Sequence, residues 1–163
     1  FKNAYFDKYK NIWHHGDYAE IKNTEGFIIY GRSDTTLNPG GVRLGTAEIY
    51  SVVEKFIEIK EAIVVGQSWD NDVRVILFII MNKNYKFNGI LSDKIKQQIR
   101  KNASPRHVPS KIIAVKDIPR TKNGKIVELA VKNTIEGNKI KNKEALVNPK
   151  VLEEYKNLKE LKN

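Results

Sequence analysis

The sequence predicts an α+β fold, in which a small three-stranded sheet is packed by helices and follows an N-terminal β-hairpin. Three observations predict it: apolar runs of strand length separated by turn residues, apolar positions at helical spacing between those runs, and two short apolar stretches around a turn near the start. With 163 residues, the chain is long enough for one domain with a buried core.

The first half of the chain contains the hairpin, a helix and the first strands of the sheet. Residues 19–21 and 27–30 flank the turn Asn23-Thr24-Glu25-Gly26, which is a hairpin signal. A helix is expected to start at Gly45-Thr46, because apolar residues then recur at helical spacing, at Ile49, Val52, Val53 and Phe56. Strands are expected at 61–65 and 73–81, and the turn-rich link between them favours an antiparallel pair.

The second half supplies the third strand and the remaining helices. We expect a strand at 111–115, preceded by a helix that Ser92 caps and that turns Ile95 and Ile99 inward. The last helix of the core is expected to begin near Lys125, to end at Gly137, and to bury Ile126, Leu129 and Ala130. A Lys/Asn-rich connector at 138–143 and a terminal helix at 149–161 complete the prediction.

Composition limits the classes of partner. The formal net charge of +10 favours an anionic partner, and nucleic acid, a membrane surface and a phosphorylated cofactor all satisfy it. The longest apolar stretch, Val75 to Met81, is far shorter than the ~20 residues that span a bilayer. The absence of cysteine is compatible with a reducing cytoplasm, which is the location we expect.

The segment from Gly31 to Tyr50 concentrates residues that suit phosphate binding. Arg32 and Arg43 carry fork-shaped guanidinium groups that can grip phosphate or carboxylate with two hydrogen bonds. Between them, Gly40 and Gly41 permit positive φ and a close approach of backbone to a ligand. The residues alone leave an alternative open, a plain hairpin turn with Leu37 and Val42 on paired strands and solvated arginines.

A second basic segment runs from Pro119 to Lys125. Gly124 allows a sharp turn there, which would hold the ammonium of Lys125 out on a mobile loop. Such a group can stabilise charge that develops on a transferring phosphoryl or acyl group. The alternative is an exposed basic turn, which is the usual environment of lysine.

Together with Trp13-His14-His15-Gly16-Asp17, these two segments resemble the C-terminal motifs of acyl-CoA synthetases of the adenylate-forming superfamily. The segment Trp13-His14-His15-Gly16-Asp17 is similar to the family's Thr-Gly-Asp motif, with His15 in place of threonine. The resemblance covers nearly the whole chain. Within the superfamily, residues 38–50, 104–109 and 145–149 look most like acetoacetyl-CoA synthetases.

The resemblance implies that the chain is a fragment of a two-domain enzyme. Residues 1–33 would be the end of the N-terminal adenylation domain, and residues 34–163 the mobile C-terminal lid that packs on it. The Gly-rich phosphate loop that holds ATP in the family is not found in this sequence. We therefore expect the fragment alone to be inactive.

The same resemblance assigns roles in the first half-reaction, in which a carboxylate attacks ATP to give an acyl-adenylate and diphosphate. Asp17 matches the aspartate that binds the ribose hydroxyls, and Arg32 and Arg43 match arginines that contact the nucleotide. Lys125 matches the catalytic lysine. Asp34 occupies the hinge position, where backbone torsions change between two conformations.

In the second half-reaction the thiol of CoA displaces AMP, and the resemblance places Gly40 and Gly41 beside the pantetheine channel. Arg100 aligns with an arginine that meets a CoA phosphate, although a solvated helix face is an equal alternative there. Mg²⁺ is expected to arrive with ATP, and no protein metal site is proposed. Gly40-Gly41-Val42-Arg43 stands where acetyl-CoA synthetases commonly have Ser-Gly-His-Arg, which moves the assignment away from acetate.

Three alternatives remain at this point. The first is an acetyl-, propionyl- or other short-chain acyl-CoA synthetase, because the carboxylate pocket of the family lies in the other domain. A nucleic-acid-binding module would need aromatic side chains interleaved with basic ones on one strand face, which the sequence does not provide. A catalytically silent binding or regulatory domain is disfavoured because Lys125, Asp17, Arg32 and Arg43 occur together. We therefore expect small-molecule partners, and neither nucleic acid nor membrane.

Overall fold

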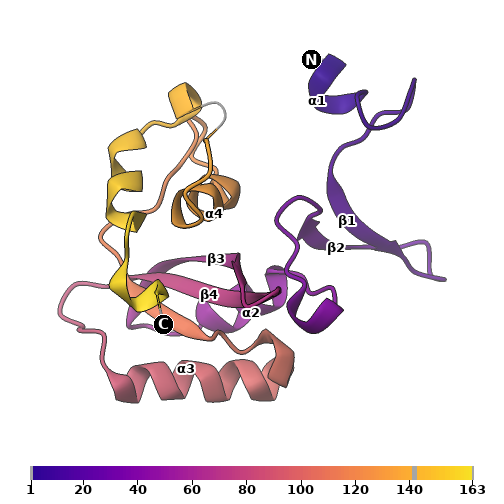
Figure 1. Ribbon diagram of the computed structural model, residues 1–163. Coiled ribbons are helices and arrows are strands. Elements are labelled where there is room, and N and C mark those ends of the chain that lie inside the picture. The colour runs from indigo at the N-terminus through magenta and orange to yellow at the C-terminus, as the bar shows by residue number, and fades with distance from the viewer. Residues whose placement is uncertain (1, 141–142, 163) are drawn as a thin grey trace.

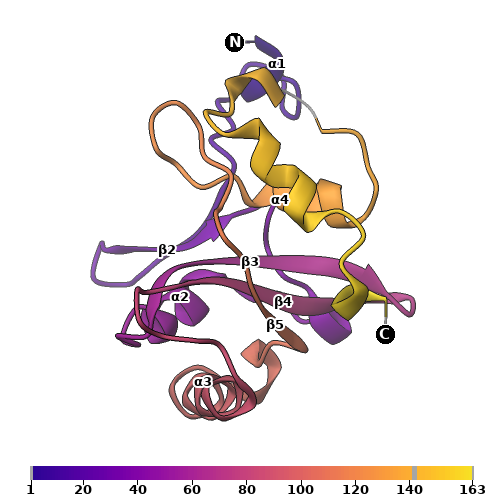
Figure 2. The same ribbon diagram turned by 90° about the vertical axis from the view of Figure 1, so that its left-hand side faces the viewer.

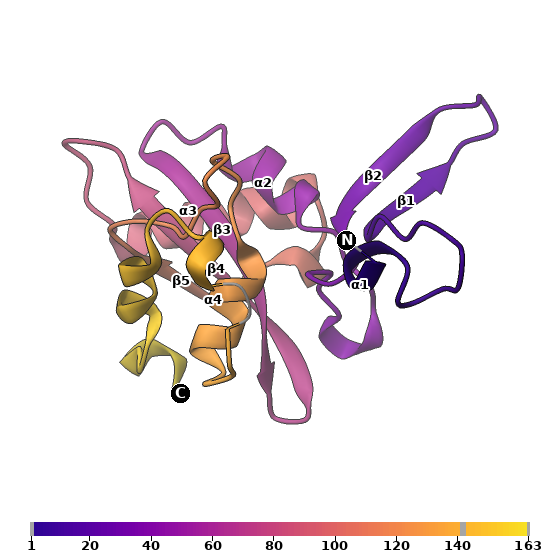
Figure 3. The same cartoon turned by 90° about the horizontal axis from the view of Figure 1, so that it is seen from above.

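The structure is a computed structural model that describes residues 2–140 and 143–162. It contains a two-stranded antiparallel hairpin that projects from a larger α+β body (Figures 1 and 3). The hairpin follows the short helix α1 (Lys2–Tyr5) and consists of β1 (Asp17–Ile21) and β2 (Phe27–Arg32). The predicted hairpin is thereby confirmed.

The body is built on a second sheet, with strand order β3-β4-β5. Strand β4 is central, antiparallel to β3 and parallel to β5. The predicted three-stranded sheet and its antiparallel pair are confirmed. The strands and α-helices of the body are α2 (Ala47–Val53), β3 (Ile59–Trp69), β4 (Asp72–Met81), α3 (Gly89–Asn102), β5 (Lys111–Ala114) and α4 (Glu128–Ile135).

The link between β3 and β4 is much shorter than the predicted 66–72. Residues 66–69 continue β3, and the turn is only Asp70 and Asn71, with φ of 50° and 58°. Two central residues of positive φ match the twist of paired strands, as in a type I′ hairpin. Gly66 lies in β3 rather than in the turn. Glycine is needed there because a Cβ would lie 2.7 Å from Val73 Cγ1 on the partner strand.

The core lies on both faces of this sheet. On one face, four strand residues pack with α2 and α3: Val64, Val75, Leu77 and Ile79. On the other face, five strand residues pack with α4 and the C-terminal 3₁₀ segments: Ile63, Val65, Ile76, Phe78 and Ile113. Figure 2 shows α3 on one side of the sheet and α4 on the other. Because both faces are covered, the strands read as continuous apolar runs rather than alternating ones.

Helices α2 and α3 agree with the sequence in the faces they bury. Helix α2 follows Thr46, as predicted, and buries its apolar face, whereas Phe56 is buried beyond the end of the helix. Helix α3 turns Ile95 and Ile99 inward, as predicted. The predicted cap was wrong: Asn88, not Ser92, accepts the hydrogen bond from Leu91 N, at 2.9 Å, and Ser92 lies inside the helix.

The last predicted helices needed more correction. Helix α4 begins at Glu128 rather than Lys125, so Ile126 precedes it, and the helix buries Ala130, Val131 and Thr134. Ile126 and Leu129, which were predicted to be buried, are 37% and 39% exposed, while Ala130 is buried as predicted. Gly137, with φ of 71°, follows the end of the helix, as predicted. Of the predicted connector at 138–143, residues 141–142 lie outside the described residues.

The C-terminal segment is not one helix. It comprises the 3₁₀ helices Lys143–Ala145, Pro149–Tyr155 and Lys159–Leu161. The predicted helix at 149–161 is interrupted at Asn157, whose φ of 55° is incompatible with a continuous right-handed helix. Within the described residues, the helices are too short or too polar to cross a bilayer.

His107 is buried beside α3 and gives the stability a predicted pH dependence. Its Nδ1 lies 2.8 Å from Ser104 Oγ, and burial lowers the pKa of the ring despite the opposing effect of Glu48. The unfolded chain therefore binds the proton more tightly. Stability should be full above the unfolded pKa of about 6.5 and fall as pH drops from there through the folded pKa.

This pH dependence is checked by urea unfolding of the chain between about pH 5 and pH 7.5. His107→Gln should flatten the decline of the unfolding free energy with falling pH, because the buried ring that must take up a proton is then absent. An unchanged slope in the His107→Gln protein would contradict the assignment.

Candidate functional site

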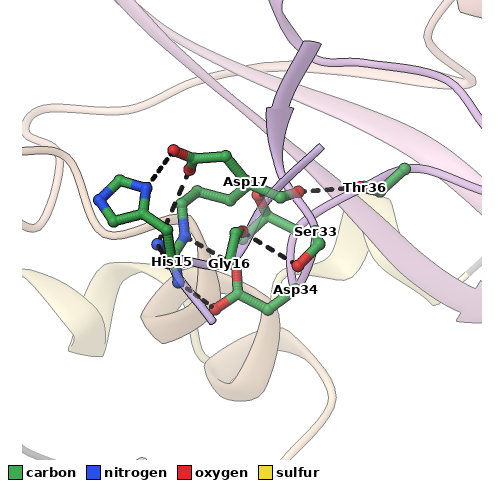
Figure 4. Close-up of polar contacts among 8 residues, drawn as sticks. His15, Gly16, Asp17, Ser33, Asp34 and Thr36 are labelled. Carbon is green, nitrogen blue, oxygen red and sulfur yellow. Dashed lines mark hydrogen bonds and ion pairs between the residues drawn. The ribbon is translucent and has the colours of Figure 1, made fainter. Parts of the chain in front are cut away.

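Arg32 is the centre of a polar cluster at the end of the hairpin. Figure 4 shows residues of this cluster, among them His15, Asp17 and Asp34. It pairs in register with Asp17 across β1 and β2, and its Nη1 lies 3.8 Å from Asp17 Oδ1. On its other side, Nε and Nη2 donate to the two carboxylate oxygens of Asp34, at 3.2 and 3.1 Å. The guanidinium thus makes the bidentate contact that its planar shape favours.

Gly16 lets the two segments of this cluster approach each other. A Cβ at residue 16 would lie 2.8 Å from Arg32 Nη2, and φ there is 89°. The carbonyl oxygen of Gly16 accepts from Ser33 N at 2.8 Å and from Ser33 Oγ at 3.0 Å, and Arg32 Nη1 donates to the carbonyl of His15 at 2.9 Å. Residues 15–17 and 32–34 therefore form one connected unit.

Asp17 has a basic neighbour on each carboxylate oxygen. His15 Nδ1 lies 2.5 Å from Oδ2, and the Arg32 guanidinium faces Oδ1. The imidazole contact was missed from the sequence, where His15 was only a replacement in a motif. Strand periodicity could not have found it, because His15 and Gly16 precede β1 and Gly16 has a φ of 89°. The pair fixes the direction in which Asp17 presents its oxygens.

The chain beyond Arg32 forms the joint between hairpin and body. Thr36 Oγ1 donates to the carbonyl of Arg32 at 2.8 Å, which closes a tight turn around Asp34. Leu37 then pairs with Leu44 through two backbone hydrogen bonds of 2.9 and 3.1 Å. The alternative hairpin therefore has Leu44, not Val42, opposite Leu37.

The glycine loop between Leu37 and Leu44 is attached to the body. Gly40 N donates to both carboxylate oxygens of Asp72, each at 2.9 Å, at the start of β4. Gly40 and Gly41 have φ of 59° and 74°, and the space in which a Cβ of Gly41 would stand is open. Asp72 is a second residue missed from the sequence, because 32 positions separate it from Gly40. These two hydrogen bonds attach the glycine loop to the body rather than to the hairpin.

Arg43 adjoins the cluster through an aromatic ring. Its guanidinium lies 5.0 Å from the centre of the Tyr18 ring, the residue that follows Asp17. Such cation–π contacts leave the hydrogen-bond donors of the guanidinium available. The structure therefore brings Asp17, Arg32 and Asp34 into direct contact and places Arg43 next to them.

Lys125 and Arg100 lie elsewhere. Lys125 is exposed on the turn before α4, where its backbone N donates to Thr121 Oγ1 at 3.1 Å, and Arg100 is exposed on α3. Helices α3 and α4 cover opposite faces of the sheet (Figure 2), so these two cations are not brought together. Among the described residues, no cluster of three acidic or histidine side chains is arranged to hold a metal ion.

The chain is similar to known proteins along its whole length. Residues 48–125 match the model of the AMP-binding enzyme C-terminal domain. The whole chain is 55% identical to acetoacetyl-coenzyme A synthetase of Rhizobium meliloti and 46% identical to acetoacetyl-CoA synthetase of Xenopus tropicalis, and covers 25% of each. The solved acetoacetyl-CoA synthetase of Streptomyces lividans superposes on 99% of the chain with a TM-score of 0.86 at 36% identity.

The chain spans about a quarter of the length of these relatives. The family that the motifs indicated is confirmed, and so is the predicted architecture of a small α+β domain after a β-hairpin. Residues 48–125 belong to the AMP-binding enzyme C-terminal domain family, and the chain is similar over its whole length to acetoacetyl-CoA synthetases.

Proposed function

We propose that this chain is the C-terminal part of an acetoacetyl-CoA synthetase, which converts acetoacetate, ATP and CoA to acetoacetyl-CoA, AMP and diphosphate. The observation that carries the proposal is similarity to acetoacetyl-CoA synthetases along the whole chain, from a bacterium at 55% and a vertebrate at 46% identity. The matched region includes the joint and the glycine loop, where the sequence departs from the pattern common in acetyl-CoA synthetases.

In this proposal residues 1–33 close the large adenylation domain and residues 34–163 form its mobile lid. The hairpin supports the division, because Ile21 and Phe27 are each 71% exposed on a two-stranded sheet that needs a partner surface. The large domain would supply that surface, the carboxylate pocket and the ATP phosphate loop. The chain alone would then have no turnover.

For the adenylation step, Asp17 would accept hydrogen bonds from the ribose hydroxyls, since an ionised carboxylate is an acceptor only. Its contacts with His15 and Arg32 support the role, because they hold the carboxylate in one orientation. Arg32 and Arg43 would contact the nucleotide phosphate. Lys125 would offset the negative charge that grows as the carboxylate oxygen attacks the α-phosphorus and diphosphate leaves.

Mg²⁺ would enter with ATP and bind mainly to phosphate oxygens, as is usual for this ion. The two carboxylates nearest the proposed nucleotide site, Asp17 and Asp34, are engaged by His15 and Arg32. These contacts occupy carboxylate oxygens that a metal ion would need, which supports a site without a protein metal ligand.

For the thioester step, the lid would rotate about Asp34 and present its glycine loop to the site. The CoA sulfur would attack the acyl carbonyl carbon, and the bond from that carbon to the AMP oxygen would break. Gly40 and Gly41 would line the pantetheine channel, and Arg100 would meet a CoA phosphate. The hold of Asp72 on Gly40 supports this, because it makes the loop move with the lid.

The test is ATP–diphosphate exchange by the full-length enzyme with acetoacetate, acetate, propionate and butyrate in turn. We expect the highest kcat/KM with acetoacetate. Faster exchange with another of these acids would keep the enzyme class and change the substrate. Absence of exchange with all four, from a folded protein, would favour a catalytically silent binding domain.

A further inference from the structure

The segment that carries Lys125 is a small closed turn. Arg120 pairs with Ile126 across it, and backbone hydrogen bonds join Thr121 N to Lys125 O at 2.9 Å and Val127 N to Pro119 O at 3.1 Å. Inside the turn, Gly124 N donates to Thr121 O at 2.8 Å. The backbone of Lys125 is thus fixed within the turn, so its place in the molecule depends on how the turn is attached.

The first attachment is an ion pair at the entry to the turn. Arg120 Nη2 donates to Glu61 Oε2 on β3, and the two side chains are only 22% and 34% exposed. Partial burial strengthens such a pair relative to one in bulk water. A bulge in β3 between Ile59 and Glu61 changes the face of the sheet to which the following residues point. Ile59 packs on the α2 and α3 face and Ile63 on the α4 face, so the bulge turns Glu61 toward the Lys125 turn.

The second attachment lies just after the turn. Glu128, the first residue of α4, accepts a hydrogen bond from the hydroxyl of Tyr50 on α2, and this hydroxyl accepts from Val64 N on β3 at 3.0 Å. Burial and the adjacent carboxylate raise the pKa of Tyr50, so the hydroxyl keeps its proton. A single buried oxygen therefore links α2, β3 and α4.

Apolar packing contributes little at this place. A pocket of about 330 Å³ opens between Ile126 of the turn and the residues that flank the start of β3, including Tyr50 and Glu61. Ile126 itself is 37% exposed. The entry of the turn is also bound to the C-terminal segment, since Arg120 N donates to Asn148 Oδ1 at 3.0 Å and Val147 N donates to Arg120 O at 2.9 Å. The contacts that fix the turn directly to β3 and α2 across this hollow are the two polar attachments on either side of it.

We infer that Glu61 and Tyr50 are positioning residues for Lys125, which hold its turn against β3 from both ends during adenylation. The inference rests on the proposed function. Both attachments are on one strand, at Glu61 and Val64, so together they restrain the turn against sliding and against rotation. A displacement of about 1 Å of a group near the reacting atoms can cost about 100-fold in rate.

The experiment compares Glu61→Gln and Tyr50→Phe in the full-length enzyme, with both half-reactions measured separately. Adenylation is followed by ATP–diphosphate exchange, and thioester formation by adding CoA to preformed acyl-adenylate. We expect kcat of exchange to fall by about 10- to 100-fold while the KM for ATP and the rate of thioester formation change by less than about threefold. Glu54→Gln, at an exposed carboxylate lining the same pocket, is the matched control and should match the wild type.

Two further measurements keep the outcome decisive. In an Arg120→Gln background, Glu61→Gln should add almost nothing, because the partner is already gone. Equal losses in both half-reactions would mean a general structural role and overturn the inference. Unchanged exchange in Glu61→Gln and Tyr50→Phe would also overturn it, provided that Lys125→Ala abolishes exchange. If Lys125→Ala itself leaves exchange intact, the assigned role of Lys125 fails instead.

Discussion

Lys125→Ala in the full-length enzyme should lower acyl-adenylate formation by about 100- to 1,000-fold, the range seen when a preorganised charge-stabilising group is removed. The ammonium would face the α-phosphate only while the lid is closed for adenylation. Thioester formation from preformed acyl-adenylate should therefore change by less than about threefold. ATP–diphosphate exchange and a CoA chase with isolated adenylate measure the two rates.

The structure also predicts that this change leaves folding intact. Lys125 is exposed, its turn is closed by backbone and Thr121 hydroxyl contacts, and its side chain has no ion pair among the described residues. The free energy of unfolding should shift by less than about 0.5 kcal/mol, as is usual for such surface positions. Lys122→Ala, on the same turn, is the matched control. Equal exchange rates for Lys125→Ala and Lys122→Ala would rule out the catalytic role.

The sequence predicted the sheet and most helices because their signals are local. Apolar runs gave β3, β4 and β5, and helical spacing gave α2 and α3. The prediction failed where tertiary packing, rather than local structure, explains the residue type. Gly66 is typical of a turn, yet it lies in a strand, where the absence of a side chain leaves room for Val73. The terminal helix failed for a similar reason, since its apolar spacing gives no sign of the positive φ at Asn157.

The candidate site shows the same contrast between residues that local motifs predicted and residues that only the fold brings together. Asp17, Arg32 and Asp34 fall in short motifs, and the structure places them in direct contact. The residues that hold the site were missed, because they act across long separations. Tyr50 and Glu128 are 78 positions apart, and their contact exists only because α2 and α4 meet at the edge of β3. Motifs in one sequence identify groups that touch a ligand better than groups that orient them.

Asp34→Pro should separate the two half-reactions more sharply than any side-chain truncation at the joint. Proline fixes φ near −65°, so a residue whose torsions must change between two lid positions would be held in one of them. We expect one half-reaction to fall by about 100-fold or more, equivalent to about 2.7 kcal/mol, and the other to stay within about threefold. The measurement is again exchange against the CoA chase.

Asp34→Ala is the control that makes this result interpretable, because Asp34 also grips Arg32 with both carboxylate oxygens. Alanine removes the carboxylate and leaves the torsions free, so any loss shared by both variants comes from the Arg32 contact. That share should be small, because both side chains are nearly half exposed, at 49% and 46%, and such pairs contribute at most about 1 kcal/mol. The same weakness would let the pair open and reform as the lid turns. Full rates of both half-reactions in Asp34→Pro would place the hinge elsewhere, whereas loss of one of them would identify the lid position that proline traps.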